Sequence, residues 1–147
     1  MTTVRTCLDQ KPQPTELVSV GPDDTVAAAL QLMRDKRVRA VLVLQAERLA
    51  GIITQGDCAI KVLLPGLDAK GVAVRDVMTV APMTVKLADP IEACMGLMAS
   101  RNFRHLPVVE AGRVVGVVSI GDVVKDNIRQ MGQQINFLET YIRGHGA

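Results

Sequence analysis

The chain has 147 residues, a mass of 15.8 kDa and a formal net charge of +2, and its composition is 48% apolar, 22% charged and 2% aromatic. This length suits one compact domain or two small merged domains, and the composition excludes disordered, collagen-like and disulfide-stapled chains. The small net charge and the presence of only two Phe and one Tyr argue against a nucleic-acid partner.

Neither a membrane segment nor a secretory signal is predicted. No apolar run approaches the roughly 18 residues that span a bilayer, and residues 1–7 lack the apolar stretch of a signal peptide. The three cysteines, Cys7, Cys58 and Cys94, are widely spaced and form no CxxC pair. We therefore expect a cytoplasmic protein with reduced, buried thiols, no membrane association and no bound metal.

The sequence contains an internal duplication with an offset of 65 residues. Between residues 20–57 and 85–122, 12 of 38 positions are identical without a gap, and most of the other positions keep their residue type. The identical pairs used below are Arg39 and Arg104, Gly51 and Gly116, Gly56 and Gly121, and Asp57 and Asp122. Such self-similarity is typical of two copies of one structural unit.

Each unit predicts the same order of elements, β-α-β-β-α. In the first, the spacing of Val26, Leu30 and Met33 predicts an amphipathic helix, with Asp24 as its N-cap. Around this helix, the pattern predicts extended segments at 18–20, 40–44 and 51–54 and a second helix from residue 56.

In the second unit, Asp89 is the expected N-cap and Pro90 the first helical residue. Extended segments are predicted at 83–85, 106–109 and 116–119, and a second helix from residue 121. Because a half of about 60 residues is marginal alone, the two are expected to bury apolar faces against each other. The predicted fold class is therefore α/β (α+β), with two tandem repeats related by a pseudo-two-fold and a long C-terminal helix.

The predicted domain organisation follows the duplication. Residues 1–66 form the first repeat with a lead-in segment, residues 67–125 the second repeat with a lead-in helix, and residues 126–147 a C-terminal helix extension. The Pro- and Gly-containing segment 64–71 is the expected linker.

The C-terminal segment carries a heptad pattern. Its apolar residues are spaced 4, 3, 4, 3 and 4 apart, at Val124, Ile128, Met131, Ile135, Leu138 and Ile142. Two interpretations follow: a helix folded back on its own domain, or a seam that packs against a second chain. We favour the second interpretation and predict a homodimer.

The repeats resemble the cystathionine β-synthase (CBS) domain, and two in tandem resemble the pair known as a Bateman module. The resemblance is carried above all by Gly51-Ile-Ile-Thr-Gln-Gly-Asp57 and Gly116-Val-Val-Ser-Ile-Gly-Asp122, and it covers nearly all of residues 1–125. It implies a non-catalytic module that binds an adenine nucleotide (AMP, ADP or ATP), or else NAD(H) or S-adenosylmethionine. It also implies association of the repeat helices in a homodimer.

The resemblance assigns candidate ligand contacts to both repeats. Asp57 and Asp122 would bind the ribose diol, because a carboxylate accepts hydrogen bonds from two hydroxyls. Gly56 and Gly121 would allow the sugar to approach the backbone. The candidate phosphate contacts are Thr54, Ser119, Arg39, Arg104 and His105, and those of the adenine pocket are Val18, Leu42, Ile53, Met83, Thr84, Pro107 and Val118. Which repeat's arginine serves which aspartate is left open.

The same residues have a structural interpretation. Thr54 with Asp57, and Ser119 with Asp122, match the helix capping box, in which the hydroxyl and the carboxylate each bind a backbone N–H. For Thr54, capping and ligand binding are compatible. Ala40 and Leu42 stand where the second repeat has His105 and Pro107, so the two sites are not expected to bind with equal affinity.

Three functions remain as hypotheses. The favoured one is a nucleotide sensor that acts on an unidentified downstream protein. A hydrolase lacks support, because the two histidines have no nucleophile at a recognisable spacing and the sequence has no HExxH, P-loop or GxGxxG motif. An interaction scaffold with vestigial sites is the third.

Overall fold

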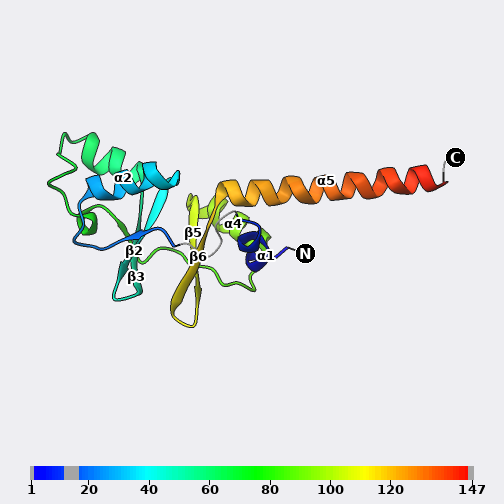
Figure 1. The fold of residues 1–147 in the computed structure, drawn as a ribbon, viewed down its shortest axis with the longest axis horizontal. Coiled ribbons are helices and arrows are strands. Elements are labelled where there is room, and N and C mark those ends of the chain that lie inside the picture. The colour runs from blue at the N-terminus through cyan, green and yellow to red at the C-terminus, as the bar shows by residue number, and fades with distance from the viewer. Residues whose placement is uncertain (1, 12–16, 146–147) are drawn as a thin grey trace.

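Each repeat is built on one β-hairpin, and the two hairpins have the same register. The first consists of β2 (Ala40–Gln45) and β3 (Arg48–Thr54), and the second of β5 (His105–Glu110) and β6 (Arg113–Ser119). Ala40 pairs with Thr54 in one, as His105 pairs with Ser119 in the other. The computed structural model, which describes residues 2–11 and 17–145, thus bears out the duplication (Figure 1).

A helix precedes each hairpin, and both helices end in the same way. These are α2 (Val26–Lys36) and α4 (Ile91–Arg101), and each is followed by a left-handed residue, Arg37 or Asn102, at a φ of 57° or 58°. In that conformation the chain leaves the helix and turns toward the next strand.

The predicted N-caps, Asp24 and Asp89, were wrong by one residue. Thr25 caps α2 by accepting the N–H of Ala28, and Pro90 stands at the cap position of α4 without a side-chain hydrogen bond. The two carboxylates instead accept backbone N–H groups three residues earlier, at 2.8 Å in both repeats. They therefore close the turn that leads into each helix.

The sheets differ in size between the repeats. The first has the order β1-β2-β3-β4, in which β1 (Ser19–Val20) is parallel to β2 and β4 (Thr79–Val80) is antiparallel to β3. The second pairs β5 with β6 and adds one parallel bridge between Val85 and Val108. Strand β4, which comes from the segment between the repeats, was not predicted.

The second helix of each unit also differs. In the first repeat it is short, with α3 (Gln55–Cys58) continued by the π-helix η1 (Ala59–Leu63). In the second it is α5 (Ile120–His145), which continues far beyond the repeat. The predicted β-α-β-β-α architecture with a long C-terminal helix is confirmed.

The lead-in segments are exchanged between the repeats. Helix α1 (Val4–Asp9) docks on the second repeat, where the N–H of Val4 donates to the Asp89 carbonyl at 2.9 Å. The 3₁₀ turn η2 (Val74–Asp76) docks on the first repeat, where the N–H of Val74 donates to the Asp24 carbonyl at 2.8 Å. Each lead-in therefore makes the same contact on the repeat that it does not precede.

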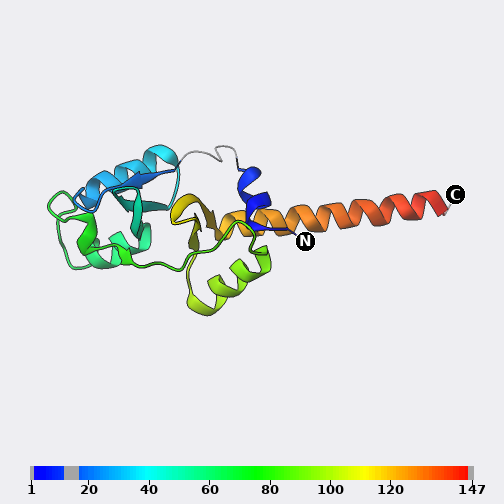
Figure 2. The same cartoon turned by 90° about the horizontal axis from the view of Figure 1, so that it is seen from below.

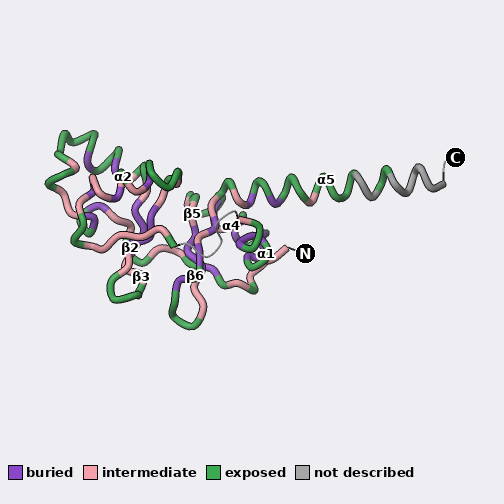
Figure 3. Tube along the Cα trace, in the orientation of Figure 1, coloured by how far each residue is buried: buried purple, intermediate pink, exposed green. Residues whose placement is uncertain are grey.

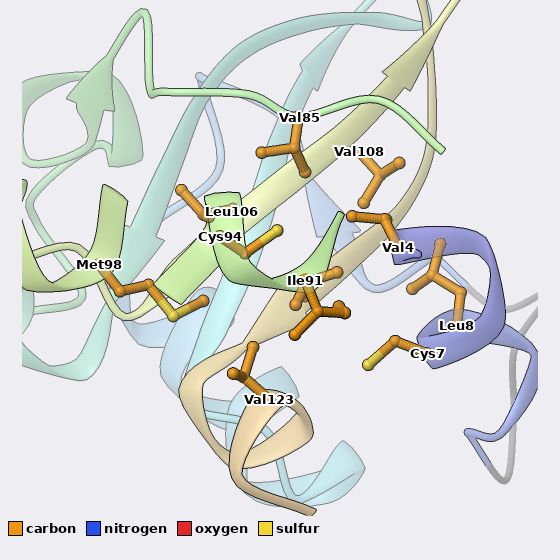
Figure 4. Close-up of a cluster of buried hydrophobic side chains, with 11 residues drawn as sticks. Val4, Cys7, Leu8, Val85, Ile91, Cys94, Met98, Leu106, Val108 and Val123 are labelled. Carbon is orange, nitrogen blue, oxygen red and sulfur yellow. The ribbon is translucent and has the colours of Figure 1, made fainter. Parts of the chain in front are cut away.

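Two apolar cores result, and both contain a lead-in segment. Figure 4 shows Val4, Cys7 and Leu8 of α1 packed beside Ile91 and Val108 of the second repeat. Val74 and Val77 belong in the same way to the core of the first repeat. The division into 1–66, 67–125 and 126–147 thus follows the chain, whereas the packing crosses it at both lead-ins.

The two sheets meet through the faces that their helices leave uncovered. Leu42 and Pro107 occupy equivalent positions of β2 and β5, and both are buried although neither belongs to a helix-side core. Strands β3 and β6 lie against each other. Burial of both faces is the expected solution for two halves that are marginal alone.

Helix α5 leaves the body and does not fold back on it. Figures 1 and 2 show it projecting past α1 and α4 in both views. Beyond its base it is exposed as far as its side chains are described (Figure 3). In the described part of the chain, no helix is both long and apolar enough to cross a membrane.

The three cysteines are buried free thiols, as predicted. Burial is the first cause that raises the pKa of each, to about 11 for Cys7. The reactive thiolate form is therefore scarce at neutral pH.

The duplicated glycines allow the exchanged lead-ins to pack, and this predicts a stability effect. A Cβ at Gly51 would lie 2.5 Å from the Thr79 carbonyl and 2.9 Å from the Met78 sulfur, and a Cβ at Gly116 would lie 2.9 Å from Leu8. We expect Gly51→Ala to lower the free energy of unfolding by about 1–3 kcal/mol, the usual cost of overpacking.

Gly96→Ala is the matched control. Gly96 lies inside α4 with open space where its Cβ would be, so the alanine should stabilise the protein by about 0.5–1 kcal/mol through helix propensity. Guanidinium unfolding of both variants measures the difference. Equal stability of Gly51→Ala and the unmodified protein would contradict the close packing of β3 on the lead-in.

Candidate functional site

Both repeats carry a complete capping box where the hairpin runs into its second helix. The Thr54 hydroxyl accepts the N–H of Asp57 at 3.1 Å, and the Asp57 Oδ2 accepts the N–H of Thr54 at 3.0 Å. Ser119 and Asp122 make the same reciprocal pair at 3.1 and 2.9 Å. The capping interpretation is therefore confirmed in both repeats.

Capping leaves the Asp57 carboxylate one oxygen that faces elsewhere. The Oδ1 atom lies 3.7 Å from the Lys61 ammonium, which itself donates to the Val77 carbonyl at 3.0 Å. This separation is too long for a strong hydrogen bond. Asp57 therefore keeps hydrogen-bonding capacity after it has capped its own helix.

Asp57 lines a cavity of about 530 Å³ between the two repeats. The lining comes from three parts of the chain: the first repeat, the segment 79–83 that contains β4, and residues 102–105, which lead from α4 into the second hairpin. The residues are Arg39, Ile52, Thr54, Gln55, Gly56, Asp57, Thr79, Pro82, Met83, Asn102, Phe103, Arg104 and His105. This volume is within the range of small-molecule sites, roughly 300–1,000 Å³.

The cavity brings together seven of the predicted site residues, those of the first repeat's turn with the basic residues of both repeats. They are Arg39, Thr54, Gly56, Asp57, Met83, Arg104 and His105. The sequence left open which arginine accompanies which aspartate. In the structure, Arg39 and Arg104 both line the cavity of Asp57. Asp57 thus shares its cavity with cations of its own repeat and of the other.

The other predicted residues do not line this cavity. Ile53 and Val118 are fully buried in the helix-side cores, Leu42 and Pro107 are buried in their strands, and Val18 packs on the first core. Thr84 is exposed, and Ser119, Gly121 and Asp122 belong to the equivalent turn of the second repeat. For Ile53 the error is one residue, because side chains alternate along β3 and Ile52 faces the cavity instead.

Several cavity residues were missed by the sequence analysis. Asn102 and Phe103 stand directly before Arg104, and Pro82 directly before Met83. Asn102 is left-handed and ends α4 just before the predicted Arg104. Their position next to Arg104 in the sequence is therefore the signal that indicates Asn102 and Phe103. No comparable sequence signal points to Thr79, whose place depends on β4.

The equivalent turn of the second repeat is occupied by a side chain that follows α1. The Lys11 ammonium lies 2.9 Å from the Asp122 Oδ2 and donates to the Val117 carbonyl at 2.7 Å. The hollow around this pair measures about 130 Å³ and is also lined by Cys7, Gln10, Lys125 and Arg129. Asp122 therefore has a built-in cation where Asp57 faces an open cavity.

The cavity is cationic. Arg39 and Arg104 carry permanent positive charge, and Asp57 is the one carboxylate among the lining residues. Burial lowers the pKa of His105; Asp122 opposes this shift, while Lys11, Arg104 and Arg39 reinforce it. At neutral pH His105 is therefore mainly uncharged, and the two arginines dominate the field.

The arrangement combines the groups that a phosphorylated nucleoside requires. One carboxylate oxygen is placed to accept hydroxyl hydrogen bonds, two guanidinium groups are available for phosphate, and Ile52, Met83 and Phe103 supply apolar contact. Among the described residues, no cluster of three or more His, Cys, Asp or Glu side chains is placed to hold a metal ion.

Comparison with known protein families identifies the repeats. The model of the CBS domain matches residues 14–63 and 74–127. Among curated proteins, the chain is 35% identical over 127 residues to the mitochondrial CBS domain-containing protein CBSX3 of Arabidopsis thaliana, covering 83% of this chain and 62% of that one. The chain thus spans less than two thirds of that relative's length.

Solved structures show the same fold. A protein with CBS domains from Burkholderia ambifaria MC40-6, named as a candidate for signal transduction, matches with a TM-score of 0.84 and 37% identity, covering 87% of this chain and 95% of that one. A hexameric CBS-CP12 protein from bloom-forming cyanobacteria matches with a TM-score of 0.70 and 28% identity, covering 75% of this chain and 65% of that one.

The lowered pKa of His105 predicts a pH-dependent stability. Because its folded-state pKa lies below the ordinary value of 6.5, the unfolded chain binds more protons in the interval between the two values. The free energy of unfolding should therefore be highest above pH 6.5 and fall as the pH drops from 6.5 toward the folded-state pKa.

His105→Gln should flatten this dependence between pH 5.5 and 7.5, and His145→Gln, which changes the chain's other histidine, should not. Guanidinium unfolding across that interval gives the comparison. A steep dependence that survives in His105→Gln would show that other groups cause it.

Proposed function

We propose, since this chain belongs to the CBS domain family as a tandem pair, that it is a regulatory module that binds an adenine nucleotide between its two repeats. The ligand is AMP, ADP or ATP, with NAD(H) and S-adenosylmethionine as alternatives that share the adenosine moiety. The observation that carries the proposal is the cationic cavity of about 530 Å³ that joins Asp57 with Arg39 and Arg104.

The roles of the residues follow from their chemistry. Asp57 accepts the ribose hydroxyls through the oxygen that capping leaves available, and Gly56 allows the sugar to come close to the backbone. Arg39, Arg104 and the Thr54 hydroxyl bind phosphate. The base lies against Ile52, Met83 and Phe103, which border the same cavity.

One ligand per chain is the stoichiometry we propose. The second predicted site, around Ser119, Gly121 and Asp122, contains the Lys11 ammonium at 2.9 Å from the carboxylate. A ligand that used Asp122 would have to displace this ion pair and its hydrogen bond to Val117. The cation that pairs with Asp57 in the described part of the chain, Lys61, lies 3.7 Å from its carboxylate.

The module is proposed to act without catalysis, through a change in how its repeats or subunits associate. Apolar side chains after α3 support association of the repeat helices, since Ile60, Leu63 and Leu64 are 63%, 77% and 76% exposed. The homodimer, the downstream protein and the cytoplasmic location remain parts of this proposal. Turnover of ATP or NAD by the purified protein would contradict it.

Binding predicts a stability gain that depends on ligand. At a concentration of 100 times the dissociation constant, the true ligand should add about 2.7 kcal/mol to the free energy of unfolding. Thermal unfolding with AMP, ADP, ATP, NAD and S-adenosylmethionine, each against a buffer of equal ionic strength, identifies it. The absence of a shift with all five would remove the basis for a nucleotide site.

The two capping boxes offer a matched pair of variants. Asp57→Asn and Asp122→Asn perturb equivalent caps, so their effects on helix capping should be alike. Only Asp57→Asn should weaken nucleotide binding, by about 1.5–3 kcal/mol for lost hydrogen bonds to a charged group. Titration calorimetry measures affinity and stoichiometry together; equal losses in both variants would assign the effect to capping.

A further inference from the structure

Helix α5 carries a continuous apolar stripe that the rest of the chain does not cover. Its members repeat at the heptad spacing, and each is about half exposed. They are Val124 at 51%, Ile128 at 61%, Met131 at 54%, Ile135 at 53% and Leu138 at 51%. The half-exposed Ile120 precedes them at the start of the helix, so the stripe begins at the body itself.

The body holds only the first turns of α5, and it does so through another face. Arg129 donates to Gln10 and Gln130 donates to Thr2. Within α5, Gln130 also donates to the buried Asp126 at 3.0 Å. These residues lie away from the stripe on the helical wheel. Figures 1 and 2 show the remaining turns extending clear of every other element.

Such a projecting helix needs a partner. Residues 131–145 of α5, about 15 in number, lie beyond the Gln130 contact with the body, and an isolated helix of that length is marginal in water. Gly132, which has no neighbour where its Cβ would be, lowers the stability of this helix further, because glycine has a low helix propensity. A stable α5 therefore requires that the stripe be covered.

We propose that a second copy of this chain covers it, as an antiparallel two-helix coiled coil formed by the α5 helices of two subunits. In this register, Ile128 packs against Leu138 of the partner subunit and Ile135 against Met131 of the partner subunit. The interface goes beyond nucleotide binding and does not depend on it.

The charges beside the stripe select this direction. Lys125, Gly132 and Glu139 occupy the same flanking position in successive heptads, and all three are exposed. In an antiparallel pair this position faces its own equivalent. The register then places Lys125 opposite Glu139 of the partner subunit twice by symmetry, with the two Gly132 residues facing each other at the centre.

A parallel pair loses this complementarity. There the same position faces the flanking position on the other side of the stripe, so that Lys125 meets Ile120 and Glu139 meets Gln134. No pair of opposite charges forms across that seam. Since such flanking charges set partner orientation in coiled coils, the sequence favours the antiparallel arrangement.

Cysteine pairing tests both the surface and its direction. Ile128→Cys and Leu138→Cys chains, distinguished by a tag on one, are mixed and mildly oxidised as full-length protein. We expect the mixed disulfide dimer as the main product. Ile128→Cys alone should give little, because its two cysteines would lie ten residues, or about 15 Å, apart along the antiparallel axis. The native thiols are buried and do not interfere.

Charge exchange provides the second arm. Lys125→Glu in both chains should slow the mixed cross-linking by roughly tenfold, since two attractive pairs become repulsive. Glu139→Lys added to Lys125→Glu should restore it. Ile135→Lys should abolish cross-linking, and Gln133→Lys, an exposed position off the stripe, should leave it unchanged.

The outcomes separate cleanly. Efficient disulfide formation by Ile128→Cys alone would overturn the antiparallel direction, and no cross-link in any mixture would overturn the second copy as the occupant. Loss of cross-linking in Lys125→Glu without rescue by Glu139→Lys would overturn the register. Nucleotide binding, measured on the Ile135→Lys variant, tests the proposed function independently.

Discussion

The exchange of lead-in segments is the constraint on which the rest of this structure depends. Val4 and Val74 each donate a backbone hydrogen bond to the repeat that their own segment does not precede. Their neighbours Leu8 and Met78 then pack over Gly116 and Gly51, where a Cβ would clash. Because both halves of the chain are held in this way, the repeats cannot separate without opening both cores.

This constraint fixes the position of the cavity. The segment from β4 to Met83 must run from the first sheet to the second repeat, and its residues Thr79, Pro82 and Met83 line the cavity. The site therefore consists of residues that are remote in sequence, and its geometry depends on how the two repeats are set relative to each other. A ligand that contacts both repeats has a natural means of favouring one setting over another.

Duplication supplies two equivalent turns, but the surroundings of each make them different. Both have the same capping hydrogen bonds, within 0.1 Å of each other. Lys11, which follows α1, reaches Asp122 from a distant part of the sequence. The cation near Asp57 is Lys61, which lies in η1 directly after α3, and its distance from the carboxylate is longer. The asymmetry therefore arises from flanking residues and is not visible in the duplicated motif itself.

The parts of the fold that the sequence could predict are those that depend on local patterns. The repeat pattern was sufficient for the hairpins, the helices and the capping boxes, since each depends on residues close together in the chain. Ile53 was placed at the cavity in error because alternation fixes which residues share a face, and not which face meets the other repeat. The lead-in exchange and the Lys11–Asp122 pair depend on tertiary packing, for which no local pattern exists.

One consequence follows from the place where α5 begins. Its first turn contains Asp122, so the helix starts at the second capping box and is rigidly joined to β6. At 1.5 Å per residue its 26 residues extend about 39 Å. Over that length, a rotation of about 5° at the base moves the far end by roughly 3 Å. Under the two proposals together, a nucleotide that changes the relative orientation of the repeats would change the geometry of the paired α5 helices. Because coupling between two sites is reciprocal, pairing of the α5 helices would change the nucleotide affinity of the cavity by the same coupling free energy.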